Sequence, residues 1–373
     1  MLDFTSVLYL DMRHPKHELR PWMQLTTGRP AALEATPEAE RVAQELARLL
    51  RCERATLAAS TLHLFWDLFD ILTGNSAAIY LDAGTYPIAR WGVERATAKG
   101  IPLSIFEMHD PNELEVLLRR DRRVRRRPVV VTDGVWPETG QVAPLPEYLR
   151  LVQEHDGYLI IDDTQALGIL GHRPGGASPY GRGGAGTPAW HGIEGPELIV
   201  ASSLAKGFGA PLAVIAGNAR LVADFESLST TRVHCSPPSL AVIAAAERAL
   251  AVNVREGDRR RSKLANLVQC FRRALRQAGL SSSGGLFPVQ TLKTKPEVDP
   301  TRLHDQLLRL GVRTVLHRAH DRPDARISFL IGAMHTSAEI LEAVVKLHTA
   351  CAVLSHQSRG ACHAATLHLR AQS

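Results

Sequence analysis

Short apolar runs alternate with amphipathic stretches along the first two thirds of the chain. The runs predict buried strands at residues 78–81, 101–106, 129–131, 158–161 and 198–200. Helices are predicted between them. One should begin after the N-cap Thr36, where Pro37 takes the first helical position, and another at the capping sequence Asp110-Pro111-Asn112-Glu113. This alternation predicts an α/β fold, with a mostly parallel central sheet and helices on both of its faces.

Polar residues follow the ends of four of these strands. They are Asp82, Asp133, Asp162 and Lys206. In open parallel sheets, ligands bind beyond the carboxyl ends of the strands. We therefore expect these four side chains to converge on one crevice, although they are far apart in sequence.

The last third of the chain predicts a second domain. A helix is expected from Ser239 to about Ala278, and its charged middle, REGDRRRSK, suggests a crossing between domains. Strand and helix patterns then alternate again from Phe287 to Ala350. We expect an N-terminal segment (1–40), a large cofactor-binding domain (41–250), a small α/β domain (251–355) and a tail (356–373).

Composition places the protein among ordinary globular proteins. The chain has 373 residues, of which 45% are apolar and 22% charged, which is enough to form a core without metals or disulfides. Its five cysteines are scattered and include no CxxC pair, so we expect reduced thiols, no metal site and a cytoplasmic location. The N-terminus lacks the pattern of a signal peptide. No apolar stretch approaches the length of about 20 residues that a membrane-spanning helix needs, so no membrane contact is expected.

The net charge of +6 owes much to one basic run, Arg119 to Arg127. Such a run can dock an acidic partner, such as the phosphates of coenzyme A or an acidic carrier protein. It can equally be a solvated helix end whose arginines complement the helix dipole. It contains no interleaved aromatic residues, so we expect no nucleic-acid partner.

One pair of residues indicates a specific chemistry. Asp162 ends a strand in LIIDDTQALGILG, and Lys206 follows another strand in SSLAKGFG. Pyridoxal 5'-phosphate requires a lysine that forms a Schiff base and a carboxylate that keeps the pyridine nitrogen protonated. The lysine must also lose its proton, which burial promotes.

Six segments, in order, resemble the α-oxoamine synthases, a group of fold-type I pyridoxal-phosphate enzymes that includes amino-oxononanoate synthase, aminoketobutyrate CoA ligase and serine palmitoyltransferase. The resemblance covers most of the chain. The segments are LDFTSVLYLDMRHP, TDGVWPETGQVAPL, DDTQALGILG, SSLAKGFG, CSPPSLAVIAAAERAL and ISFLIGAMHTSAEI. The resemblance implies the fold of that group, which is shared with aspartate aminotransferase, and a homodimer with active sites at the subunit interface.

The resemblance assigns cofactor roles residue by residue. Lys206 matches the Schiff-base lysine, and Asp162 matches the aspartate that pairs with the pyridine nitrogen. Ser203 matches a hydroxyl residue that binds the cofactor phosphate. Asp133 matches an acidic or polar position beside the ring.

Three further residues match the cofactor site. Tyr86 falls on the histidine that stacks on the ring, and a phenol can stack in its place. Ser60 and Thr61 fall on a turn whose backbone amides hold the phosphate, and this turn should open a helix. Lys206, Asp162 and Tyr86 are the candidate catalytic residues.

The chain departs from the family pattern at the positions that contact the substrate and the phenolic oxygen of the cofactor ring. Gln165 stands at a histidine that contacts the phenolic oxygen, and Val7 stands at an asparagine. Ser328 replaces the second arginine of the "RxRIS" segment, which clamps the substrate carboxylate, and only the first, Arg326, is kept. Plain structural roles remain open: core packing for Tyr86, a turn for Gln165 and a solvated strand position for Arg326.

The missing clamp leaves two alternatives. Arg326, Arg318 or Arg322 replaces it, or the substrate has no carboxylate at that position. We therefore expect a pyridoxal-phosphate-dependent acyltransferase that condenses an amine or amino acid with an acyl thioester of coenzyme A or a carrier protein, in a specialised biosynthetic pathway. An aminotransferase on the same fold is the alternative, and a non-catalytic binding protein is a third reading.

Overall fold

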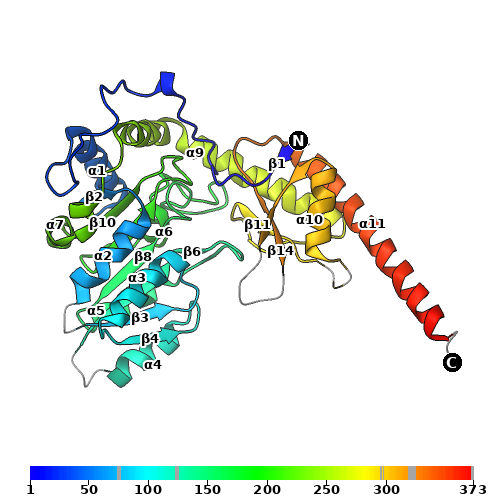
Figure 1. The fold of residues 1–373 in the computed structure, drawn as a ribbon, viewed down its shortest axis with the longest axis horizontal. Helices are drawn as coiled ribbons and strands as arrows, with labels where there is room; N and C mark the ends of the chain where they lie inside the picture. Colours follow the sequence, from blue (N-terminus) through cyan, green and yellow to red (C-terminus); the bar gives the residue numbers. More distant parts are fainter. Residues whose placement is uncertain (74–76, 122–125, 295, 297, 318–324, 371–373) are drawn as a thin grey trace. The chain divides into compact units, whose positions relative to one another are not determined.

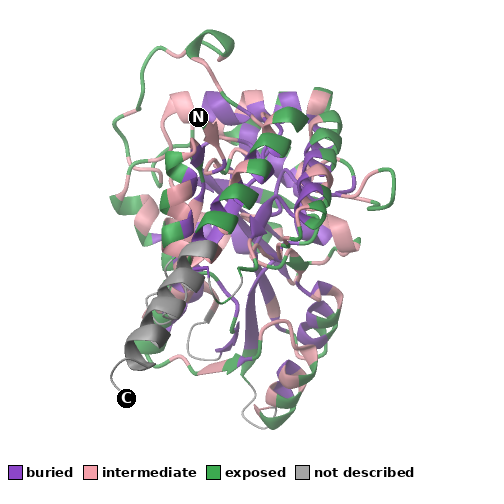
Figure 2. Cartoon of the chain, turned by 90° about the vertical axis from the view of Figure 1, so that its right-hand side faces the viewer, coloured by how far each residue is buried: buried purple, intermediate pink, exposed green. Residues whose placement is uncertain are grey.

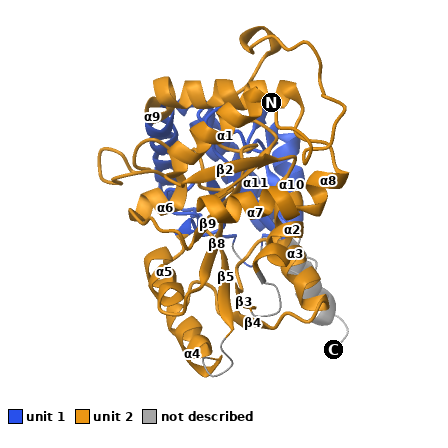
Figure 3. Cartoon of the chain, turned by 90° about the vertical axis from the view of Figure 1, so that its left-hand side faces the viewer, with its two compact units in different colours: residues 1–11, 137–141, 260–373 blue, residues 12–136, 142–259 orange. Residues whose placement is uncertain are grey.

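The computed structural model describes residues 1–73, 77–121, 126–294, 296, 298–317 and 325–370, and the side chains of all of these except 73 and 356–370. The chain forms two compact units (Figure 3). The large unit comprises Met12–Trp136 and Val142–Arg259. The small unit comprises Met1–Asp11, Pro137–Gln141 and the chain from Arg260 onward.

The large unit is built on a seven-stranded sheet (Figure 1). Its strands, in spatial order, are β2 (Arg54–Ala58), β10 (Ala213–Gly217), β9 (Leu198–Ser203), β8 (Tyr158–Asp162), β5 (Arg127–Asp133), β3 (Ala77–Asp82) and β4 (Leu103–Phe106). The five strands from β9 to β4 are parallel, and β10 runs antiparallel to both of its neighbours. All five predicted strands are confirmed, and so is the mostly parallel sheet.

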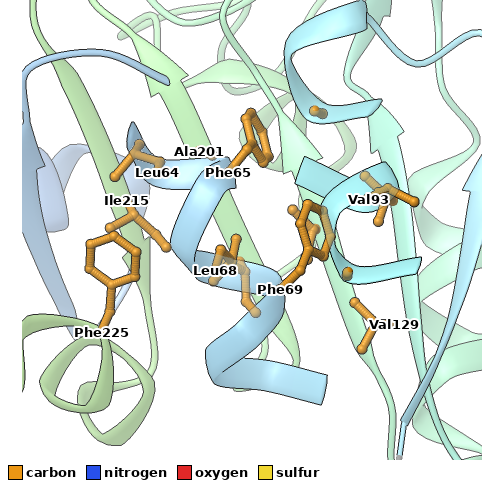
Figure 4. Close-up of a cluster of buried hydrophobic side chains, with 14 of the residues drawn as sticks. Leu64, Phe65, Leu68, Phe69, Val93, Val129, Ala201, Ile215 and Phe225 are labelled. Carbon is orange, nitrogen blue, oxygen red and sulfur yellow. The ribbon is translucent and has the colours of Figure 1, made fainter. Parts of the chain in front are cut away.

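Helices cover both faces of this sheet. One face packs against α2 (Thr61–Thr73), α3 (Pro87–Ala98) and α7 (Ala219–Leu228), and the other against α4 (Pro111–Asp121) and α5 (Leu145–Gln153). Figure 4 shows the first core, in which Phe65, Leu68 and Phe69 of α2 meet strand residues such as Val129 and Ile215. Buried residues concentrate in the strands and on the inward sides of the helices (Figure 2).

Local capping explains where two helices begin. Thr36 precedes α1 (Pro37–Leu50), and its hydroxyl accepts a hydrogen bond from Ala39 N at 3.2 Å. Asp110 precedes α4, and its carboxylate accepts from the backbone of Asn112 and Glu113. These hydrogen bonds satisfy amides that the first helical turn leaves without intrahelical partners, so both predicted starts are confirmed.

Shorter elements complete the large unit. They are η1 (Lys16–Glu18), β6 (Val135–Trp136), α6 (Gly186–His191) and α8 (Thr230–His234). The strand β7 (Gln141–Val142) pairs with β6. The long helix α9 (Leu240–Gln277) matches the predicted helix, and the division between the two units falls within it, between Arg259 and Arg260.

The small unit contains a three-stranded antiparallel sheet in the order β11 (Val289–Thr291), β14 (Arg326–Leu330) and β13 (Val315–His317). The first residues of the chain belong to this unit, because β1 (Leu2–Asp3) pairs with β12 (Val312–Arg313) and Phe4 O accepts from Leu330 N. The helices are α10 (Pro300–Arg309) and α11 (Ser337–Arg370). No helix in the described part of the chain is long and apolar enough to cross a membrane.

Candidate functional site

Strand register places two buried carboxylates side by side. Asp133 ends β5 and Asp162 ends β8, and the two residues are directly paired across these parallel strands. Lys206 follows β9, the next strand, and interacts electrostatically with both carboxylates. The fold therefore brings together Asp133, Asp162 and Lys206 at the carboxyl edge of the sheet.

Burial dominates the electrostatics of both carboxylates. It raises the pKa of Asp162, against the opposing hydrogen bonds from Thr164 and the charge of Lys206. Burial also raises the pKa of Asp133 well above its ordinary range, and the neighbouring charge of Asp162 adds to this effect. The backbone N–H of Tyr86 donates to Asp133 at 3.1 Å and partly offsets the rise in its pKa.

The lysine shows the opposite response to burial. Desolvation lowers the pKa of Lys206, although the charges of Asp162 and Asp133 act to raise it. A buried ammonium loses its proton more readily than an exposed one, because a low-dielectric environment disfavours the charged form. The amine of Lys206 is therefore tuned towards nucleophilic or basic chemistry.

Asp163, the neighbour of Asp162, has a separate structural role. Its carboxylate accepts hydrogen bonds from Thr187 N at 3.0 Å and from Thr187 Oγ1 at 2.6 Å. A Cβ at Gly186, which has φ +86°, would lie 1.7 Å from Asp163 Oδ2, so only glycine allows this approach. Asp163 thus anchors the start of α6 within the glycine-rich stretch.

Asp82 also has a structural role. It accepts hydrogen bonds from Gly84 N at 2.8 Å, from Thr132 Oγ1 at 3.2 Å and from Tyr148 Oη at 3.2 Å. Its donors come from several elements, so it fixes the loop that leads to Tyr86. Its charge still reaches the site, where it helps to raise the pKa of Asp133.

Thr164 links the carboxylate to the neighbouring strand and was not anticipated from the sequence. Its N–H donates to Asp162 Oδ1 at 3.0 Å, and its hydroxyl accepts from Ser203 N at 3.0 Å. Ser203 Oγ in turn accepts from Ala205 N at 3.3 Å, one residue before Lys206. The one sequence signal for this role is a threonine two residues after the strand-ending aspartate, which is typical of a turn that bonds its own backbone.

The start of α2 lies in the same part of the sheet as Ser203. Ala213 of β10 is paired with Ala58 of β2 on one side and with Ser203 of β9 on the other. Only Ala59 and Ser60 separate β2 from α2, which begins at Thr61, as predicted. Ser60 Oγ is hydrogen-bonded to His63 Nδ1 at 2.7 Å, so the His63 side chain has its partner within this turn.

Two other predicted site residues belong to loops of the large unit. Tyr86 is the residue before α3, and 56% of its surface is exposed, which excludes the core-packing alternative. Gln165 is half-buried and follows Thr164 in the turn after β8. The structure thus shows where both residues lie along the chain. Their contacts with a cofactor ring remain predictions.

The three predicted substrate residues all belong to the small unit. Arg326 Nη1 pairs with Glu138 Oε2 at 2.5 Å. Ser328 is fully buried and hydrogen-bonded to Thr291 Oγ1 at 2.8 Å, within the β11–β14 pair. Val7 is at the surface, and its carbonyl accepts from Tyr9 N. Arg318 and Arg322 lie outside the described residues.

Comparison with known proteins identifies the family. The model of the aminotransferase class I and II family matches residues 20–359. The chain belongs to this family. Its fold is therefore that of the pyridoxal-phosphate transferases, as the sequence predicted.

Curated relatives within the family are 8-amino-7-oxononanoate synthases. The relative from Thioalkalivibrio sulfidiphilus is 31% identical over 57% of this chain and 52% of its own length. The relative from Nitrosococcus oceani is 29% identical over 65% of this chain and 62% of its own length. The match thus spans a little over half of each relative, and their names confirm the resemblance to the α-oxoamine synthases.

Solved structures share the fold over nearly the whole chain. A serine palmitoyltransferase from Sphingomonas wittichii has a TM-score of 0.80 at 17% identity, covering 94% of this chain and 87% of its own. The 8-amino-7-oxononanoate synthase from Francisella tularensis has a TM-score of 0.73 at 18% identity, covering 94% and 97%. At this level of identity the likeness establishes the fold.

The basic run is only partly described. Arg119 pairs with Glu115 and Arg120 with Asp121, both on α4, while residues 122–125 lie outside the described part. The guanidinium of Arg127 lies over the Tyr158 ring at 4.5 Å. Arg119, Arg120 and Arg127 thus have local partners, which favours the interpretation of the run as a solvated helix end.

The residues of the large unit provide the kinds of groups that bind pyridoxal phosphate. A lysine with a lowered pKa interacts with two buried carboxylates, and the helix α2 begins after β2, which is separated from Ser203 of β9 by the strand β10. Within the described residues, no group of three histidine, cysteine or acidic side chains is placed to hold a metal ion. The chemistry of these groups therefore suits a phosphate-bearing aldehyde.

Proposed function

We propose that the protein is a pyridoxal-phosphate-dependent acyltransferase of the α-oxoamine synthase type. It would condense an amine or amino acid with an acyl thioester and form a carbon–carbon bond. The observation that carries this proposal is the half-buried Lys206, which has a lowered pKa and lies beside the buried carboxylates of Asp162 and Asp133. The names of the curated relatives, 8-amino-7-oxononanoate synthases, support the reaction class.

Pyridoxal phosphate, when bound, supplies an electron sink for a carbanion at the substrate's α-carbon. Lys206 would hold the cofactor covalently and then move the α-proton as a base, a task that its lowered pKa favours. Asp162 would pair with the pyridine nitrogen, because the backbone N–H of Thr164 fixes its carboxylate at the end of β8. Asp133, whose raised pKa favours the protonated form, would donate a hydrogen bond beside the ring.

The phosphate would be held by hydroxyl and amide groups rather than by lysine or arginine. Ser203 offers its hydroxyl, and the turn of Ser60 and Thr61 offers the first amides of α2. The N-terminus of a helix attracts a phosphate because its free N–H groups and its dipole favour negative charge. Tyr86 would stack on the ring, and Gln165 would donate to the ring oxygen without titrating.

Substrate recognition depends on Arg326 in this proposal. Arg326 already forms an ion pair with Glu138, so a substrate carboxylate must displace Glu138 or bind elsewhere. Ser328 offers no substitute, because its hydroxyl is buried against Thr291. These contacts favour an amine substrate without a carboxylate at this position, and Val7 would leave the neighbouring position apolar.

The thioester partner and the dimer belong to the same proposal. The carrier would be coenzyme A or an acyl carrier protein, whose acidic groups suit the net charge of +6. We propose a homodimer with active sites at the interface, because exposed apolar side chains gather on the adjoining helices α2 and α3 and at the start of α3. They are Leu62, Trp66, Tyr86 and Trp91.

Tyr86 also favours a second candidate function, that of an aminotransferase. An aromatic ring that stacks on the cofactor is common in aminotransferases, and this chain has tyrosine where the α-oxoamine synthases have histidine. An aminotransferase would convert the cofactor to its pyridoxamine form with an amino donor alone. An acyltransferase would require the thioester before turnover, so single-turnover spectra separate the two.

The experiment that tests the proposal is an absorbance titration with pyridoxal phosphate. We expect a band of the lysine-bound cofactor in the wild type and its loss in Lys206→Ala, with turnover reduced by about a thousandfold or more. Lys99→Ala is the control, because Lys99 is an exposed lysine paired with Asp70 in the same unit. A band that persists in Lys206→Ala would refute the role of this lysine.

A further inference from the structure

The large unit contains a cavity of about 870 Å³ that none of the proposed site residues lines. It lies along β2, four of whose residues, 54–57, line it together. Successive residues of a strand point to opposite faces of a sheet. A cavity that touches four in a row therefore faces the edge of the strand rather than one face of the sheet.

The helices around the cavity support this position. Its lining includes residues of both α1 and α7, which lie on either side of β2 (Figure 3). β2 is the last strand of the seven-stranded sheet, and among the described residues its only strand partner is β10. The cavity thus runs along the free edge of the sheet.

The outward-facing backbone groups of this edge have no hydrogen-bond partner in the described part of the chain. Within the described residues, Ala55, Thr56 and Leu57 make backbone hydrogen bonds only with β10, and all three are more than 90% buried. Every second N–H and C=O of an edge strand points away from its partner. Buried backbone groups of this kind usually have partners, because an unmade hydrogen bond costs about 1–3 kcal/mol.

The opposite wall keeps the space open. Ala39, Ala43 and Ala47 stand four residues apart on α1 and line the cavity with methyl groups, and Glu40, Gln44 and Arg48 of the same helix add polar side chains to the lining. A strap of residues 25–36 borders the cavity and is fixed at two points: Leu25 O accepts from Leu240 N, and Ala31 O accepts from Arg232 Nη2. The wall is thus recessed and the strap is anchored, which leaves room for a chain beside β2.

The charges of the lining decide against a simple anion. Three arginines and four glutamates border the cavity, and two of them, Arg54 and Glu226, pair with each other. Such a lining has nearly balanced charge and does not select a phosphate or a carboxylate. The repeating N–H and C=O groups of the strand instead match an amide backbone.

We propose that this edge binds a short extended peptide segment of a partner protein, which adds to the sheet as a strand beside β2. The four lining residues span about 13 Å, which corresponds to roughly four residues of an added strand. Small or β-branched side chains on one side of the peptide would face Ala39, Ala43 and Ala47 of α1. The site is independent of the proposed catalytic function, because it shares no residue with the site at Lys206.

The test uses a fluorescein-labelled pentapeptide, Ala-Val-Thr-Val-Ala, blocked at both ends, and the full-length protein. We expect saturable binding by fluorescence anisotropy, together with slower amide hydrogen exchange in residues 54–58. Ala43→Phe places a ring in the cavity and should weaken binding at least about tenfold. Ala39→Phe, at the more accessible start of α1, is the second variant if Ala43→Phe does not fold.

The controls separate this site from the catalytic one. Ala98→Phe places the same ring at the exposed end of α3 and should bind the peptide like the wild type. Lys206→Ala should also bind it normally, even though it loses turnover. Absence of binding at millimolar peptide, or equal binding by the Ala43→Phe and wild-type proteins, would overturn the proposal. Self-association that excludes the peptide would assign the edge to a second copy of the chain, and would also overturn it.

Discussion

At the scale of single residues, adjacent side chains of the same type have different roles. Asp162 lies beside Lys206 and Asp133, whereas Asp163 holds Thr187 at the start of α6. The sequence Asp162-Asp163-Thr164 places two aspartates at the end of the strand, and only one of them need face a cofactor. The hydrogen-bond partners, which come from a segment 24 residues away, decide which one does.

We predict that the two aspartates respond differently to replacement by asparagine. Asp162→Asn should abolish the shift in absorbance on cofactor binding, while Asp163→Asn should keep it. Burial raises the pKa of Asp163 from 3.8 to about 7, so between these values the folded protein holds a proton that the unfolded chain releases. The stability that Asp163 contributes therefore falls as the pH rises through this window.

Thermal denaturation at pH 5 and pH 8 checks the second half of this prediction. The drop in Tm between these two pH values should be several degrees smaller in Asp163→Asn than in the wild type, because asparagine does not titrate. Asp162→Asn with an unchanged cofactor band would contradict the assignment of Asp162.

Arg326 raises a related question, since the half-kept RxRIS segment is its only signal in the sequence. We predict that Glu138→Gln lowers the KM for carboxylated amines by about tenfold, because the freed guanidinium gains an anionic partner. The KM for amines without a carboxylate should not change. Glu115→Gln, which frees Arg119 on α4, is the matched control. Equal effects on both kinds of amine would exclude Arg326 from carboxylate recognition.

At the scale of elements, helix packing is set by close contacts that no periodicity reveals. Helices α2 and α3 pack together through Phe65, Phe69 and Val93 (Figure 4). Gly92 allows this approach, because a Cβ there would lie 2.3 Å from Phe65 O and 2.9 Å from Phe69 Cδ2. The contact positions α3, and with it Tyr86 at its start.

We predict that Gly92→Ala lowers the free energy of unfolding by about 2 kcal/mol through overpacking. This loss should occur even though alanine is intrinsically better in a helix than glycine by about 1 kcal/mol. Chemical denaturation measures the change. Gly176→Ala is the control, because a Cβ at Gly176 meets nothing within 4 Å. A stabilised Gly92→Ala protein would show that α2 and α3 separate at little cost.

At the scale of the whole molecule, the surface carries apolar side chains that a soluble monomer would rarely group. Trp91 is 49% exposed and Trp66 is 43% exposed, and both lie on the paired helices α2 and α3. The guanidinium of Arg95 covers part of Trp66, at 4.6 Å from the ring centroid. Grouped exposed aromatics of this kind are typical of protein interfaces.

We predict that Trp91→Glu weakens the proposed homodimer, because it places a carboxylate in a buried apolar contact. Sedimentation velocity should show a dimer for the wild type and mostly monomer for the variant at micromolar concentration. Val116→Glu, on the exposed side of α4, should leave the dimer intact. A wild-type monomer would refute the homodimer directly.

The sequence by itself determined the α/β class, the strand order along the chain, the two capped helix starts and the family, because these depend on local periodicity and on short motifs. It also indicated Lys206 and Asp162 as partners, because both follow strand ends. The strands β2 and β10, at one end of the sheet, were not predicted, since an alanine-rich run has the same apolar pattern in a helix or a strand.

Only the tertiary structure decided which neighbours each polar group has. It separated Asp162 from Asp163, gave Asp82 a structural role, and introduced Thr164 and the Arg326–Glu138 pair. These contacts join residues from different elements, and the energy of each depends on burial and distance. Neither quantity is encoded in any local stretch of sequence, so the fold had to be known before the chemistry of these groups could be assigned.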